Sequence, residues 1–176
     1  MNRFVFGLIF ACFILIEPVG AEWAHRAGER DPFKGGSPHS AGYFKLDLST
    51  PEAFWFQCHT ARNLRLIWDT GRNVGNSNPN LEHHITVRIA LVVDGAAPMF
   101  IAGRPTRTDN GDLMIVSDDV IAVQRLVLAI AAAKREIAVA GEINGRLRFS
   151  EGLPIANASQ SVQKLVAGCR LGSPSS

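Results

Sequence analysis

Apolar and polar residues alternate with period two along several short segments of the chain. The cleanest alternation runs from Ile85 to Val93 and ends at the turn pair Asp94-Gly95. Successive side chains of a strand point to opposite faces, so this pattern predicts strands with one buried face. The predicted strands are Tyr43 to Leu48, Phe54 to Cys58, Asn63 to Asp69, Ile85 to Val93, Pro98 to Ala102 and Asp112 to Val116.

After residue 117 the apolar period changes to that of a helix. Ser117 or Asp118 is the predicted N-cap, because a short polar side chain accepts a hydrogen bond from the free amides of a first turn. Lys134 and Arg135 lie where the helix dipole favours cations. The predicted apolar face comprises Val120, Val123, Leu126, Val127 and Ile130.

Two further elements complete the pattern. A hairpin is predicted around Asn144-Gly145, and a short helix, capped by Asn157 or Ser159, is predicted to end at Cys169. Strands grouped apart from helices indicate an α+β fold. We therefore expect a mostly antiparallel sheet or small sandwich with one long helix and a short C-terminal helix.

The first 21 residues have the pattern of a secretory signal peptide. Arg3 precedes the apolar run Phe4 to Ile16, and the small residues Val19-Gly20-Ala21 predict cleavage after Ala21. An uncleaved anchor is the alternative interpretation. The mature chain is expected to contain no membrane span, because no later apolar run approaches about 20 residues. Periplasmic or secreted localisation follows from this interpretation.

Composition divides the rest of the chain. Residues 22–42 are rich in Gly, Pro, His and Arg and predict an N-terminal arm; residues 43–171 predict a single domain, and residues 172–176 a polar tail. A loop is predicted from Thr70 to Glu82. The formal charge is +2 without charged blocks, so nucleic acid is not an expected partner.

Signal-peptide removal leaves two cysteines, Cys58 and Cys169. In an oxidising compartment their expected state is a disulfide. The sequence leaves open a reactive thiol at Cys58, because His59 follows it, but a thiolate would need the cysteine reduced.

Few other residues suggest chemistry, and no catalytic residue or cofactor is predicted. Glu82, His83 and His84 are candidate metal ligands, although adjacent histidines on a strand point to opposite faces. Carboxylates occur mostly where turns and caps favour Asp. These are Asp69, Asp94, Asp109, Asp112, Asp118 and Asp119. Three tryptophans, Trp23, Trp55 and Trp68, suggest either a recognition surface or core packing.

Several short motifs give the chain a family resemblance. They are Trp23 followed by Asp31-Pro32-Phe33-Lys34-Gly35, the strands Phe54 to Cys58 and Leu64 to Trp68, the block Val87 to Gly95, and Phe149-Ser150-Glu151-Gly152-Leu153 followed by Cys169. Together they resemble the VasI-like accessory family of type VI secretion and its periplasmic relatives. The resemblance implies a disulfide-linked, non-enzymatic domain of the bacterial envelope.

The expected function is therefore that of an exported binding or accessory protein whose partner is another envelope or secreted protein. Two alternatives stay open from the residues alone. One is a cell-envelope hydrolase or thiol-dependent enzyme. The other is an inhibitor of a secreted hydrolase, for which polar loops such as Thr70 to Glu82 are suited.

Overall fold

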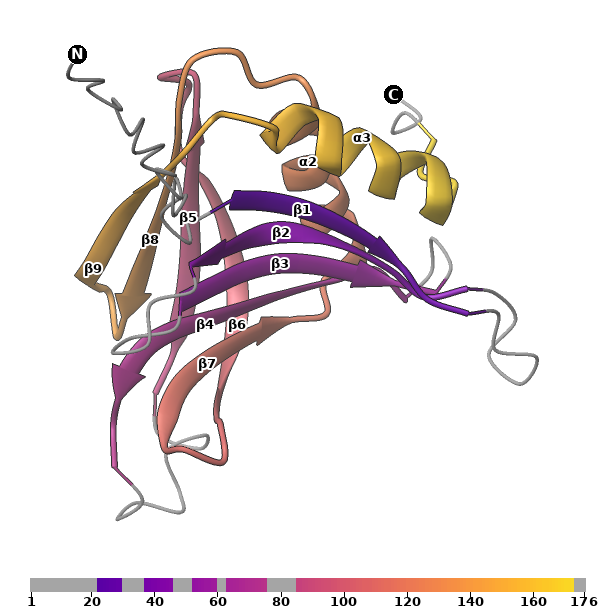
Figure 1. Ribbon diagram of the computed structural model, residues 1–176. Coiled ribbons are helices and arrows are strands. Elements are labelled where there is room, and N and C mark those ends of the chain that lie inside the picture. Colours follow the sequence, from indigo (N-terminus) through magenta and orange to yellow (C-terminus); the bar gives the residue numbers. More distant parts are fainter. Residues whose placement is uncertain (1–21, 30–36, 46–51, 60–62, 76–84, 173–176) are drawn as a thin grey trace, which may run out of the picture.

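The computed structural model describes residues 22–29, 37–45, 52–59, 63–75 and 85–172. In these residues nine antiparallel strands form one sheet, in the order β1-β2-β3-β4-β7-β6-β5-β8-β9. The strands are β1 (Glu22–Ala27), β2 (His39–Lys45), β3 (Glu52–Cys58), β4 (Arg65–Asn73), β5 (Val87–Val93), β6 (Met99–Arg107), β7 (Asp112–Ser117), β8 (Ile137–Ile143) and β9 (Arg146–Leu153). The sheet curls into a half-barrel, and helices α2 (Val120–Ala131) and α3 (Ala158–Cys169) cover one end of its inner face (Figure 1).

The long strand β6 allows the sheet to curl. Its residues 99–103 pair with β5, whereas its residues 104–107 pair with β7. Gly103 lies at the junction, and a Cβ atom built there would be 2.5 Å from Cγ2 of Ile115. The absence of a side chain at Gly103 therefore lets β6 approach Ile115 closely at the bend.

Alternation and cross-strand register build one apolar inner face. Phe54, Phe56 and Cys58 are buried on β3, and Phe54 pairs with Trp68 and Phe56 with Leu66 on β4. Directly opposed residues of neighbouring strands share a face, so the buried positions continue from strand to strand. The inner face and the two helices together enclose one hydrophobic core.

The predicted tight turns are confirmed. Asp94 and Gly95 have φ values of 53° and 74°, and Asn144 and Gly145 have values of 50° and 75°. Positive φ at both central residues is the geometry of a type I′ turn, and Asn, Asp and Gly tolerate it best. Each of these turns depends on the preferences of two adjacent residues, and the structure forms both turns where the sequence predicts them.

Helix α2 begins later than predicted. Ser117 is the last residue of β7 and pairs with Leu66, so neither it nor Asp118 is the cap. Asp119 is the cap instead, because its Oδ1 accepts a hydrogen bond from the backbone N of Ala122 at 3.0 Å. Sheet pairing therefore extends the strand to residue 117 and moves the helix start downstream.

The same helix also ends earlier than predicted. Lys134 and Arg135 lie beyond its last residue, Ala131, and do not complement its dipole. Their backbone N–H groups, with that of Glu136, donate hydrogen bonds to the carboxylate of Asp94 at 2.9, 2.7 and 3.1 Å. A contact with a distant turn therefore sets the conformation of this segment.

The predicted α+β fold class is wrong. Strands make up 52% of the described residues, and the sheet is a single curled half-barrel. Helices α2 and α3 have 12 residues each, so there is no pairing of one long and one short helix. The prediction failed because it assigned too few residues to strands and placed the ends of the first helix from local signals alone.

Segments predicted as irregular contribute much of the missing strand. The predicted arm 22–42 contains β1 and the start of β2, which pair along their length. β4 continues to Asn73 within the predicted loop Thr70 to Glu82. Residues 76–84 lie outside the described residues. The strand ends that the prediction missed are polar, and the alternation of apolar and polar residues is a weak signal there.

Candidate functional site

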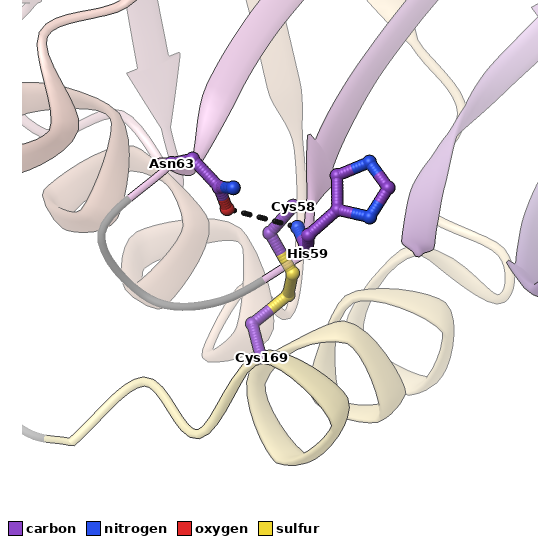
Figure 2. The surroundings of a disulfide bond; sticks show 4 residues. All are labelled: Cys58, His59, Asn63 and Cys169. Carbon is purple, nitrogen blue, oxygen red and sulfur yellow. Dashed lines mark hydrogen bonds between the residues drawn. A yellow bond between two sulfur atoms is a disulfide. The ribbon is translucent and has the colours of Figure 1, made fainter. Parts of the chain in front are cut away.

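One end of the inner face is closed by the disulfide. Cys58 at the end of β3 is bonded to Cys169, the last residue of α3, with a Cα–Cα distance of 6.2 Å (Figure 2). The exposed fraction is 0% for Cys58 and 2% for Cys169. The predicted pairing is confirmed, and it places Cys58 as a structural link between sheet and helix.

The surroundings of Cys58 do not present it as a nucleophile. The ring of the adjacent His59 points away from the sulfur atoms, and the backbone N of His59 donates to Oδ1 of Asn63 at 2.9 Å (Figure 2). A nucleophile would need a free thiolate that meets a base. These surroundings therefore support a structural role for Cys58 in the disulfide.

A hollow of about 470 Å³ lies beside the disulfide. Its polar walls include the exposed Arg65 and Asp118, and Nη2 of Arg65 donates to Oε1 of Gln57 at 3.3 Å. The lining residues are Gln57, Cys58, His59, Asn63, Leu64, Arg65, Asp118 and Val120. Arg65 and Asp118 are exposed and His59 is half-buried, and none of these lining residues is a Phe, Tyr or Trp.

A second hollow lies where the curled sheet brings β9 against β4, and we call it the seam pocket. Its volume is about 160 Å³. The two strands are distant in the sheet order, yet the ring centroids of Trp68 and Phe149 are 5.1 Å apart. The seam pocket is lined by Lys45, Glu52, Trp68, Thr70, Arg72, Phe149, Ser150 and Glu151.

Phe149 is held in place from two sides. It lies over Gly141 of β8, where a built Cβ atom would come within 2.3 Å of two ring carbons. On the other side Trp68 meets it edge-on, and Cζ of Arg72 lies 5.0 Å from its ring centroid. Aromatic and cation–π contacts of this kind join β9 to β4 without backbone pairing.

The ionisable groups of the seam pocket influence one another. Burial, the nearby charge of Glu52 and a hydrogen bond with its carboxyl raise the pKa of Glu151, and Lys45 and Arg72 partly oppose this. Lys45 Nζ lies 3.4 Å from Oε2 of Glu52, whose charge raises the pKa of Lys45. Burial, followed by the charge of Glu151, raises the pKa of Tyr43. Such perturbed groups in a hollow are typical of functional sites.

The sequence left open a recognition surface or core packing for the three tryptophans, and core packing describes two of them. Trp23 and Trp68 are each 3% exposed and belong to the core, where Nε1 of Trp23 donates to the backbone oxygen of Pro154 at 2.6 Å. Trp55 is half-buried on the outer face of β3, opposite Gly42. The structure therefore does not bring the three indoles together.

The candidate metal ligands Glu82, His83 and His84 lie outside the described residues. Within the described part of the chain, no three His, Cys, Asp or Glu side chains are grouped as a metal ion would require. Among the same residues, no helix is long and apolar enough to cross a membrane.

Sequence reasoning missed Glu52 and Glu151, the two acids of the seam pocket. A signal was present in the alternation of their strands. Glu151 falls between Phe149 and Leu153 at positions that share one face, and Glu52 shares the face of Phe54. A charged residue in register with buried apolar neighbours indicates an inward-facing acid.

Asp69, a carboxylate named in the sequence, is close to the seam pocket but does not line it. It precedes Thr70 on β4 and therefore points to the other face of the sheet. Burial raises its pKa, while a hydrogen bond from the backbone N of Gly71, at 3.1 Å, acts in the opposite direction. The seam pocket thus draws its acids from β3 and β9.

Comparison with known proteins supplies no relative for this chain. No protein-family model, curated protein or solved structure matches it.

Proposed function

We propose that this chain is an exported binding or accessory protein of the bacterial envelope that acts without catalysis. The seam pocket is the observation that carries the proposal. It is a hollow on the inner face of a sheet whose other end is closed by two helices and a disulfide. Small concave sites with a few convergent charged groups and aromatic walls are typical of ligand binding.

Export is supported by the leader pattern of residues 1–21 and by the bonded cysteines. Disulfides persist in the periplasm and outside the cell, and are rare in the reducing cytosol. The resemblance to VasI-like accessory proteins favours another envelope or secreted protein as the partner. Binding without chemistry is favoured because Cys58, the candidate nucleophile of the sequence, is bonded to Cys169.

Localisation tests the proposal directly. The full chain, carrying a C-terminal tag, would be produced in a Gram-negative bacterium and followed by fractionation, intact mass and thiol labelling. We expect a periplasmic or secreted protein that begins at Glu22 and contains no reactive thiol. A full-length protein that stays in the cytoplasm with reactive cysteines would overturn the proposal.

Partner capture tests the binding role. Envelope proteins would be cross-linked to the exported protein, with Arg72→Gln as the site variant and Arg146→Gln as the matched control on exposed β9 surface. We expect a specific partner that the site variant captures less well than the control does. Equal capture by both variants would place the interaction outside the seam pocket.

A cell-envelope hydrolase is the second candidate, and the Glu52–Glu151 pair favours it. Burial raises the pKa of Glu151, and a carboxyl of raised pKa beside a second carboxyl is a common source of a general acid. Hydrolysis of an envelope polymer by the purified protein, abolished by Glu151→Gln while folding is retained, would establish this candidate in place of the first.

A further inference from the structure

We propose that the seam pocket binds a small zwitterion, with an ammonium and a carboxylate a few bonds apart as in a free α-amino acid. The inference rests on the proposed binding function and names the ligand of that same site. Size is the first argument, because a volume of about 160 Å³ has room for a ligand of amino-acid size. The mixed charges of the wall supply the remaining arguments.

Arg72 provides the place for the carboxylate. Its guanidinium lies over the Phe149 ring, and it forms no ion pair with any carboxylate among the described residues. A guanidinium stacked on a ring keeps its N–H edge free, and that edge matches the two oxygens of a carboxylate. Phe149 is itself fixed by Gly141 and Trp68, so Arg72 is supported by a rigid surface.

Glu52 and Glu151 provide the place for the ammonium. The ammonium of Lys45 pairs with Glu52 at 3.4 Å, whereas Glu151 forms no ion pair within the described residues. The raised pKa of Glu151 has burial as its main cause and the charge of Glu52 as the next, so its negative charge is incompletely compensated. A ligand ammonium carries three N–H donors and could bond to both carboxyls at once.

Charge balance favours a zwitterion over a simple ion. When both acids are ionised, Glu52 and Glu151 balance Lys45 and Arg72, so the pocket has no excess of either sign. A simple anion would be repelled by the two carboxylates, and a simple cation would be repelled by Lys45 and Arg72. A ligand with both charges places its carboxylate beside the cations and its ammonium beside the acids, so the pocket favours it over singly charged ligands.

Protonation of the pocket follows from the same groups. The titratable and charged side chains that act on Glu151 are Tyr43 and Lys45 of β2, Glu52 of β3 and Arg72 of β4. An ammonium bound beside Glu151 replaces the proton that this carboxyl holds below its raised pKa, so we expect binding to release protons near that pKa.

Isothermal titration calorimetry of the oxidised mature protein tests the inference. The probes are alanine, as each enantiomer, N-acetylalanine, which lacks the ammonium charge, and alaninamide, which lacks the carboxylate. We expect saturable binding of at least one alanine enantiomer and at least about tenfold weaker binding of both analogues, equivalent to about 1.4 kcal/mol per lost charge pair.

Site variants assign each charge. With Arg72→Gln, alanine and alaninamide should bind equally weakly, and with Glu151→Gln, alanine and N-acetylalanine should do so. The control Arg146→Gln, on exposed surface, should bind as the wild type does. Circular dichroism and urea unfolding would establish that each variant is folded.

Two results would overturn the inference. One is the absence of saturable binding by either alanine enantiomer, and the other is equal binding of alanine and its charge-deleted analogues. If the protein is nevertheless exported and disulfide-bonded, the proposed function stands and only the ligand class is wrong. If export itself fails, the proposed function is overturned independently of the calorimetry.

Discussion

Trp68 and Phe149 lie edge to face with ring centroids 5.1 Å apart, although their strands β4 and β9 are not neighbours in the sheet. The contact exists because the sheet curls until its last strand faces the inner side of its fourth. It forms one wall of the seam pocket. The stability of the half-barrel and the geometry of the pocket therefore depend on the same pair of rings.

Gly141→Ala should disturb this contact. The added Cβ would lie 2.3 Å from two carbons of the Phe149 ring, so the ring must move away from its present position. Overpacking of this kind costs about 1–3 kcal/mol. Urea unfolding measures the loss, and Gly152→Ala is the matched control, because a Cβ on this other strand glycine meets nothing within 4 Å. Equal stability of the two variants would show that Phe149 is not held as described.

Loss of the disulfide should weaken the docking of α3. The bond joins residues 111 positions apart, and closing a loop of this length is worth on the order of 4–5 kcal/mol in the chain-entropy model. We expect the double variant Cys58→Ala, Cys169→Ala to unfold at a clearly lower urea concentration than the oxidised protein. Wild-type protein treated with reductant should behave like the variant, and an unchanged unfolding midpoint would contradict the structural role of the bond.

Glu151 should make the protein less stable as pH rises. Its folded-state pKa is raised above the ordinary value of 4.5, so the folded protein binds the proton more tightly than the unfolded chain does. The resulting stabilisation is fully present below pH 4.5 and is lost as pH rises through the raised folded value. Urea midpoints over a pH series should show this slope, and Glu151→Gln should reduce it. A Glu136→Gln control removes an exposed carboxylate outside the seam pocket and should leave the slope in place.

Asp94 should have the opposite effect. Hydrogen bonds from the backbone N–H groups of Arg135, Glu136 and Lys134 lower its pKa below the ordinary 3.8. Its stabilisation is therefore present above pH 3.8 and is lost as pH falls through the lowered folded value. Asp94→Asn keeps a residue that tolerates the φ of 53° and removes the charge. We expect Asp94→Asn to unfold more easily at neutral pH and to converge with the wild type in acid. Parallel stability curves would show that the charge contributes nothing.

Patterns within a few residues were sufficient for some of the strands and for the tight turns. The alternation predicted β3 and β5 closely, and Asn144-Gly145 predicted the β8–β9 hairpin. The expectation of an exported chain predicted that Cys58 pairs with Cys169, and the structure contains this disulfide. These features are set locally, by side-chain periodicity, by the φ preferences of turn residues, or by composition.

The seam pocket could not be predicted from such patterns. Glu52 and Glu151 are 99 positions apart in the chain, and they meet only because the sheet curls around its core. An inward-facing acid is visible in the alternation of each strand, but its partner is not. Geometry between strands that share no hydrogen bonds depends on the total curvature of the sheet.

The sequence by itself determined the alternation of strands such as β3 and β5 and the turns at Asp94-Gly95 and Asn144-Gly145, because these features depend on residue type and short spacing. The tertiary structure decided where α2 ends, because Asp94 binds the amides that follow it. It also decided which acids meet. Both outcomes depend on contacts between distant segments, and those contacts are fixed by packing of the whole inner face and not by the preferences of neighbouring residues.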